Sequence, residues 1–123
     1  MKDVASYLSV IKALIIAHPQ VTQLFVVREE AQGNIGLLRY RLTLRDGGLL
    51  ELFERFQVQE EPVKATKYSF HWQDAEGHLR KRWDNVAHHP ELETYPHHIH
   101  DGAENNVYPH EAISIEEVLT LFS

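Results

Sequence analysis

Histidine is concentrated in the stretch from Trp83 to His110, which holds six of the nine histidines of the chain and none of its lysines or arginines. The six are His88, His89, His97, His98, His100 and His110, and the acidic residues among them are Asp84, Glu91, Glu93, Asp101 and Glu104. Imidazole titrates near neutral pH, and it can transfer protons or bind metals. This density exceeds what the packing of a loop requires, so the stretch is the first candidate for a functional site.

Acid–base cleavage of RNA is one reaction that these residue types allow. Without a metal it needs a base for the 2′-hydroxyl, an acid for the leaving oxygen and a cation for the developing negative charge. Histidine suits the first two roles, and the planar guanidinium of arginine suits phosphate. The candidate catalytic residues are His71, His88, His89, His97 and His98, with Glu91 to orient an imidazole. The candidate substrate-binding residues are Arg39, Arg41, Arg82 and Asn85.

Metal binding is the second use of the same residues. His98 and His100 are separated by one residue, so on an extended segment both rings point to the same side. His88, His89, Glu91 and Asp101 can supply further ligands, and imidazole with carboxylate suits zinc, nickel or iron. Because the spacing matches no established metal motif, no cofactor is predicted firmly. A divalent metal at His98 and His100 remains an alternative.

Each candidate also has a plain structural role. His88 and His89 can bond loop carbonyls, His97 can pack beside Pro96, and His71 can be a half-buried sheet residue. Arg39 and Arg41 can simply form a solvated face. A non-catalytic module, whose acidic and histidine-rich surface binds a basic partner, is therefore a further function class.

Charge is distributed unevenly along the chain. The net charge is −6, but residues 1–82 carry all 12 Lys and Arg against 10 acids, whereas residues 83–123 carry 8 acids alone. A typical nucleic-acid-binding protein is basic overall, so any such surface must be local. The chain has no cysteine, which excludes disulfides and thiolate chemistry. No apolar run approaches the roughly 20 residues that span a bilayer, and no signal peptide is recognisable, so we expect a cytoplasmic protein away from membranes.

The elements that must position the histidines are a helix and a series of strands. Apolar residues at three- and four-residue spacing between Val4 and Ile15 predict a helix with Asp3 as N-cap, which Pro19 stops near Ala17 or His18. Strands are predicted at residues 23–28, 35–45, 49–58, 64–74 and 79–85, joined by glycine turns at Gly47 and Gly77. Tyr68, Phe70 and Trp72 are predicted core residues. Glu54 interrupts the core face of its strand, which suggests a bulge or an edge.

Beyond Asn85 the alternation disappears, which predicts a functional loop of about 28 residues. Ser114 and Glu117 form a capping box that begins a last helix, with Ile113 placed to pack on Val118. The predicted fold is α+β. It is a single domain over residues 1–123, with about five antiparallel strands in a meander, a helix at each end and a long histidine-rich loop. The helices cover the apolar face, and the other face exposes Arg39, Arg41, Ser69, His71 and Arg80 or Arg82 to a groove under the loop.

Four segments together resemble one known family. They are LTLRDGGLLELFE (42–54), YSFHWQDAEGHLRKRWDN (68–85), HHPELETYPHHIH (88–100) and the closing V-x-P with S-x-E-x-V-L (107–119). They are similar to the TumE family of small prokaryotic toxins of type II toxin–antitoxin pairs, over roughly residues 40–120. The residues that match the family pattern are His71, Trp72, Trp83, Asp84, Asn85, His88, His89, Pro90, Glu91, Pro96, His97, His98 and His100. Two positions depart from it: Val86-Ala87 replace an Ala-Pro-like pair, and Ile99 replaces a basic residue.

The resemblance implies a cytoplasmic bacterial or archaeal protein with a cognate antitoxin as partner and an activity directed at RNA or nucleotides. The leading hypothesis is a toxin that acts as a metal-independent ribonuclease. Its rivals are a non-catalytic interaction module and a metal-dependent hydrolase that uses His98, His100, His88 and a carboxylate. A strand edge is also compatible with a homo-oligomer.

Overall fold

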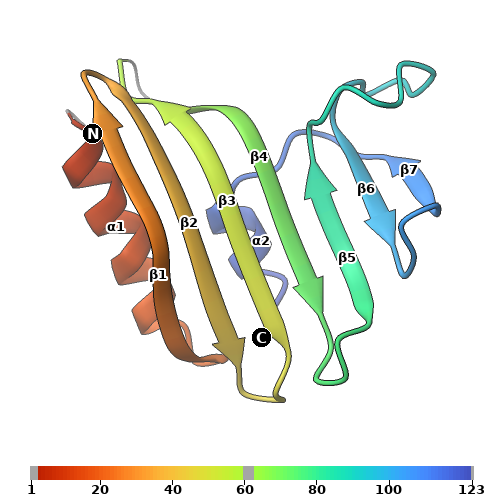
Figure 1. Ribbon diagram of the computed structural model, residues 1–123, viewed down its shortest axis with the longest axis horizontal. Coiled ribbons are helices and arrows are strands. Elements are labelled where there is room, and N and C mark those ends of the chain that lie inside the picture. The colour runs from red at the N-terminus through yellow and green to blue at the C-terminus, as the bar shows by residue number, and fades with distance from the viewer. Residues whose placement is uncertain (1–2, 60–62, 123) are drawn as a thin grey trace.

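The described residues form an antiparallel sheet of seven strands with two helices on one face (Figure 1). This computed structural model describes residues 3–59 and 63–122, so residues 1–2, 60–62 and 123 of the predicted domain lie outside the described residues. The strands follow one another in chain order from β1 to β7. In chain order the elements are α1 (Val4–Ala17), β1 (Val21–Gln32), β2 (Ile35–Leu44), β3 (Leu49–Gln57), β4 (Lys64–Gln73), β5 (Leu79–Asp84), β6 (His98–Asp101), β7 (Val107–Pro109) and α2 (Ile115–Leu119).

The predicted α+β class and the meander are confirmed, but the strand count is higher than predicted. The additional strands are β6 and β7, which lie inside the segment predicted as one long loop. They contain four and three residues, which is too short for alternation to stand out in a sequence. β1 is also longer than predicted, because pairing with β2 continues as far as Gln32.

Local sequence signals set the ends of the helices. The side chain of Asp3 accepts a hydrogen bond from the Ser6 N–H at 2.7 Å and so caps α1. α1 ends before His18, one residue ahead of Pro19, as predicted. The capping box at the start of α2 is present, with both of its reciprocal hydrogen bonds between Ser114 and Glu117.

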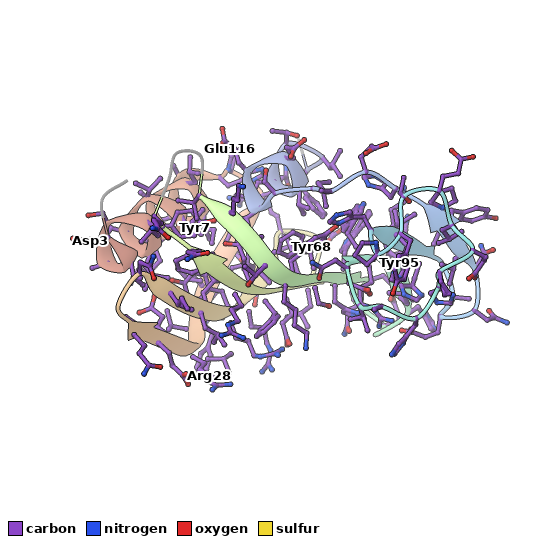
Figure 2. The ribbon with its side chains drawn as sticks, turned by 90° about the horizontal axis from the view of Figure 1, so that it is seen from above. Asp3, Tyr7, Arg28, Tyr68, Tyr95 and Glu116 are labelled. Carbon is purple, nitrogen blue, oxygen red and sulfur yellow. The ribbon has the colours of Figure 1, made fainter. Side chains whose placement is uncertain are left out.

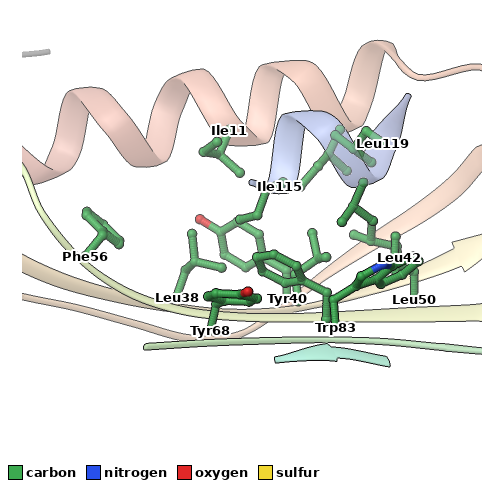
Figure 3. Packing of buried hydrophobic residues seen from close by; sticks show 14 of the residues in the cluster. Ile11, Leu38, Tyr40, Leu42, Leu50, Phe56, Tyr68, Trp83, Ile115 and Leu119 are labelled. Carbon is green, nitrogen blue, oxygen red and sulfur yellow. The ribbon is translucent and has the colours of Figure 1, made fainter. Parts of the chain in front are cut away.

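The core lies between the sheet and the two helices (Figure 3). The sheet contributes alternate residues of its strands, which explains why Tyr68 and Phe70 are buried as predicted, while Trp72 packs against this core partly exposed. Trp83 of β5 and Ile99 of β6 are paired neighbours and extend the core towards the last strands. β5 and β6 are therefore attached to the main body by apolar packing as well as by hydrogen bonds.

Glu54 lies on this core face, and the prediction of a bulge or edge at this residue is wrong. It keeps its register within the interior strand β3, opposite Leu38 and Tyr68, and the irregularity falls one residue later. The residue is 2% exposed, and its carboxyl accepts a hydrogen bond from the Tyr7 hydroxyl at 2.5 Å. Burial raises the pKa of Glu54 to about 7, although the bond from Tyr7 opposes the rise.

The other face of the sheet carries no helix in the described structure, and we call it the open face. Figure 2 shows the helices on one side of the sheet and Arg28 on the other. The strand register places open-face side chains in rows across the sheet. One row runs through Arg41, Glu51, His71, Arg82 and His100, and the next runs through Arg39, Phe53, Ser69, Asp84 and His98. The sheet thus connects the predicted cations to the histidines of β6.

Candidate functional site

The candidate site is built on β5 and β6, where two histidines meet a carboxylate. Asp84 is paired with His98 and Arg82 with His100 across the two strands. Because alternate residues of a strand point to the same face, these four side chains all lie on the open face. Trp83 and Ile99, which separate them in the sequence, point into the core.

Asp84, His98 and His100 form a compact buried cluster, which we call the Asp–His–His cluster. They are 3%, 3% and 7% exposed, so their polar atoms are nearly removed from water. His98 Nε2 lies 2.9 Å from Asp84 Oδ1, His100 Nε2 lies 3.4 Å from Asp84 Oδ2, and the two Nε2 atoms are 3.1 Å apart. The ligand-type atoms of all three residues lie within 4.8 Å of one another.

Main-chain carbonyls fix the orientation of both rings. His98 Nδ1 donates to the carbonyl of Pro96 at 2.9 Å, and His100 Nδ1 donates to the carbonyl of Glu104 at 2.8 Å. A carbonyl oxygen can only accept, so Nδ1 carries the hydrogen in each ring. In the neutral rings both Nε2 atoms are therefore acceptors, and they face each other and the Asp84 carboxylate.

Arg82 and Glu104 border this cluster. Arg82 Nη1 donates to Glu104 Oε1 at 2.6 Å, Nη2 donates to Oε2, and Nε donates to Asp84 Oδ2 at 3.3 Å. Partial burial disfavours the charge of Arg82, but its bonds to Glu104 and Asp84 outweigh burial and raise its pKa. The hydrogen bond from Arg82 lowers the pKa of Glu104. At neutral pH both groups are charged.

A pocket of about 350 Å³ opens above the cluster. It is lined by Ser69, Arg82, Asp84, Val86, His88, His89, His98, His100 and Glu104. The ring centroid of His89 lies 5.1 Å from that of His98, and its Nδ1 lies 3.4 Å from Glu91. The structure therefore brings the predicted residues His88, His89, His98 and Arg82 to one pocket, with Glu91 behind His89.

Other predicted site residues lie elsewhere. His97 stacks on Tyr68 at 5.8 Å between ring centroids, on the side of the sheet away from His98. Burial raises the pKa of Tyr68 to about 12, so its hydroxyl keeps its hydrogen, and the hydroxyl is hydrogen-bonded with His97 Nδ1 at 3.0 Å. The Asn85 side chain binds the backbone of β4 at Tyr68 and Thr66. These residues hold strands and loops together.

The predicted cations and His71 lie on the open face beside the pocket. Arg39 and Arg41 share Glu51, at 2.6 and 3.2 Å, so each is partly neutralised. The Arg39 guanidinium also lies 4.7 Å from the ring centre of Phe53. His71 Nε2 lies 3.0 Å from the side-chain oxygen of Gln73 and occupies the row between Glu51 and Arg82.

Two members of the site were not assigned a role from the sequence. The sequence indicates Asp84 only as an acidic neighbour and a residue of the family pattern, whereas in the structure it closes the cluster with His98 and His100. Glu104 was likewise only a nearby acid, although it holds Arg82. Both contacts depend on the register of β5 against β6, and that register is not visible in residue spacing.

The fold and site together define a small α+β protein with a polar pocket of imidazoles, a carboxylate and a guanidinium on the open face of an antiparallel sheet. The helices of the described structure are not long and apolar enough to cross a membrane. The family model described as Toxin TumE matches residues 11–123, so the chain belongs to the TumE toxin family. No curated protein and no solved structure matches the chain.

Proposed function

We propose that this TumE-family toxin is an enzyme that cleaves RNA at the pocket over β5 and β6. The observation that supports this proposal is the convergence of Arg82, His89 and the Asp–His–His cluster on one pocket. A reaction at a phosphodiester needs a cation for the phosphate, groups that transfer protons and a place for the reacting atoms. The lining residues supply all three.

Arg82 is the phosphate-binding residue in this proposal. Its guanidinium presents two parallel N–H groups at the pocket, and these now bind the carboxylate of Glu104. A phosphate presents a similar pair of oxygens and can take the place of that carboxylate. Glu104 has an exposed side chain, so it can move aside for a substrate.

His88 and His89 are the proton-transfer groups in this proposal. The His89 side chain is 30% exposed, so it can reach both solvent and a bound substrate. The nearby Glu91 carboxylate favours one orientation of the His89 ring. His98, the other predicted catalytic histidine on the pocket, belongs to its floor.

The open face supplies a path for the RNA chain leading to the pocket. Its cations include Arg28, Arg39, Arg41, Arg55, Lys67 and Arg82. Phe53 lies among them, and Phe25 of β1 occupies the row of Arg41 with 59% exposure. Cations along a groove track phosphates, while aromatic rings and guanidinium planes stack on unpaired bases. These features favour single-stranded RNA.

Purified protein with end-labelled RNA tests the proposal. We expect His89→Ala and Arg82→Ala to lower the cleavage rate by about 100-fold or more, the range that proton transfer and charge stabilisation contribute. His78→Ala is the matched control, because His78 lies in the β4–β5 turn with a 78% exposed side chain. Equal cleavage by all four proteins contradicts the assignment of the pocket.

The cellular test is to express the protein in bacteria with and without its cognate antitoxin and to measure growth. The wild-type chain should arrest growth when expressed alone, and the His89→Ala variant should not. Growth arrest with intact RNA in every sample would replace the enzymatic proposal with the non-catalytic interaction module.

A further inference from the structure

We propose that Asp84, His98 and His100 bind one divalent transition-metal ion of the zinc class. This inference deepens the proposed function, since the ion would lie at the floor of the same pocket. It differs from the ligand set expected from the sequence, because the carboxylate is Asp84 of β5 and not Glu91 or Asp101. The two histidines come from β6.

The first argument is the pattern of hydrogen-bond donors and acceptors. Both Nδ1–H groups are taken by main-chain carbonyls, which leaves an acceptor lone pair on each Nε2. Metal-binding histidines are commonly held in this way, with the second ring nitrogen donating to a carbonyl. The two lone pairs and the Asp84 carboxylate then face one another, and a cation or a proton between them is needed to offset their repulsion.

The second argument is distance. With metal–ligand bonds of about 2.0–2.1 Å, the ligand atoms around a tetrahedral ion lie roughly 3.3 Å apart. His98 Nε2 lies 2.9 Å from Asp84 Oδ1, His100 Nε2 lies 3.4 Å from the other oxygen, Oδ2, and the two Nε2 atoms are 3.1 Å apart, with one ligand atom per residue all within 4.8 Å of one another. The two imidazole nitrogens are thus at coordination spacing, and each has one oxygen of Asp84 at a comparable distance, so a small rotation of the carboxylate completes a three-ligand set.

The third argument is the net charge of the buried cluster and its two charged neighbours. Asp84 and Glu104 contribute two negative charges, and Arg82 contributes one positive charge, so this group has a net charge of −1 with both imidazoles neutral. Asp84 is held by the Val86 N–H at 3.1 Å and by Arg82 Nε, which orient the carboxylate. A divalent cation suits this environment, because the oriented nitrogen and oxygen ligands are only 3–7% exposed and water solvates them poorly.

The fourth argument concerns the kind of metal site. Three protein ligands at a pocket leave coordination positions for water or substrate, which distinguishes catalytic from structural zinc sites. Ser69, His88 and His89 line the same pocket and face that open side. A bound ion would polarise a phosphate oxygen or a water molecule held next to Arg82.

The alternative source of positive charge is a proton on one imidazole, and metal titration distinguishes the two. Chelator-treated, metal-free protein is titrated with Zn²⁺ by calorimetry, without RNA. We expect one ion per chain for the wild type and an affinity at least about 100-fold lower for His100→Gln and Asp84→Asn. His78→Ala should bind like the wild type. Saturation with less than one ion per chain, or unchanged affinity in folded His100→Gln, overturns the proposal.

Because Asp84 and His100 are buried, their variants need a second measurement that does not depend on them. Co²⁺ added to the metal-free wild type should give visible absorption typical of four- or five-coordinate nitrogen and oxygen ligands. A spectrum identical to that of aqueous Co²⁺ overturns the proposal. Failure of this inference differs from failure of the proposed function: cleavage that continues in chelator, together with no Zn²⁺ binding in the calorimetric titration, refutes the metal site alone. Stoichiometric metal with intact RNA refutes the ribonuclease alone.

Discussion

The guanidinium of Arg82 and the carboxylate of Glu104 form a two-point ion pair at the rim of the pocket, with Nη1 donating to Oε1 at 2.6 Å and Nη2 donating to Oε2. The Glu104 carboxylate therefore occupies the donors that a phosphate needs. Strand β6 and the turn after it bring the two residues together, although 22 positions separate them in the sequence.

Glu104→Gln should therefore increase the affinity for RNA. Loss of the carboxylate frees Arg82 and removes a negative charge from the path of the phosphates, so we expect binding about 3- to 10-fold tighter at low salt. Fluorescence anisotropy with a labelled single strand measures this change. The matched control is Glu93→Gln, an acid of the loop between β5 and β6 that is outside the pocket lining. Weaker binding by Glu104→Gln would show that Arg82 requires Glu104 to be correctly placed.

Lys67→Ala and Arg55→Ala test the open face as the path of the RNA. The two residues are opposite each other on β3 and β4. Each phosphate contact to a single strand contributes about 0.7 to the slope of log affinity against log salt, so each substitution should reduce that slope by about this amount. Lys12→Ala is the control, because Lys12 belongs to helix α1, on the other side of the sheet, and its Nζ lies 3.0 Å from the Glu29 carboxylate. Equal slopes for all three variants would place the RNA elsewhere.

Glu54 should make the stability of the protein depend on pH. Its pKa is raised by burial from 4.5 to about 7, so between these values the native state holds a proton that the unfolded chain releases. The native state binds more protons there, and the free energy of unfolding falls as the pH rises from about 4.5 to about 7. Each pKa unit corresponds to about 1.4 kcal/mol, so this group contributes a fall on the order of 3 kcal/mol.

Urea unfolding at several pH values measures this effect in the wild type and in Glu54→Gln. The glutamine keeps an acceptor for the Tyr7 hydroxyl and cannot titrate, so the variant should lose that part of the pH dependence and be more stable at pH 8. The difference between the two proteins isolates Glu54 from the titration of the histidines. Parallel stability curves would mean that Glu54 is already ionised at pH 5.

Ile99 links the candidate site to the core, and its truncation should weaken both. Its side chain is 9% exposed beside Trp83, so Ile99→Ala should lower the free energy of unfolding by roughly 2–4 kcal/mol. Since His98 and His100 flank it on β6, Zn²⁺ affinity should also fall. Ile16→Ala, at a residue 71% exposed, should change stability by less than about 0.5 kcal/mol. A large loss of stability with unchanged Zn²⁺ affinity would separate the ligands from the packing of β6.

Elements with long periodicity or a local capping or turn signal were predictable from the sequence, and the short strands β6 and β7 were not. Asp3, Pro19 and the Ser114–Glu117 box set helix boundaries through local chemistry, and alternation over ten residues identified β2 and β4. β6 alternates over only His98, Ile99 and His100, which is too few residues to separate a strand from a loop. Glu54 was misplaced because its partner, Tyr7, comes from a helix 47 positions away.

The candidate site was predictable in composition but not in geometry. Histidine density identified the correct segment, and the spacing of His98 and His100 predicted that both rings face one way, as they do. The choice of Asp84 as their neighbour depends on the pairing of β5 with β6. The contact of Arg39 and Arg41 with Glu51 follows from the register of the β2–β3 hairpin, which the turn at Gly47 already implied.

The anchors of His98 and His100 are main-chain carbonyls, at Pro96 and Glu104. Every amino acid brings the same carbonyl to its position, so a change of side chain at residue 104 leaves the imidazole of His100 attached. The rim of the pocket can therefore be redesigned to alter its charge and substrate preference while the two imidazole rings beneath it keep their orientation.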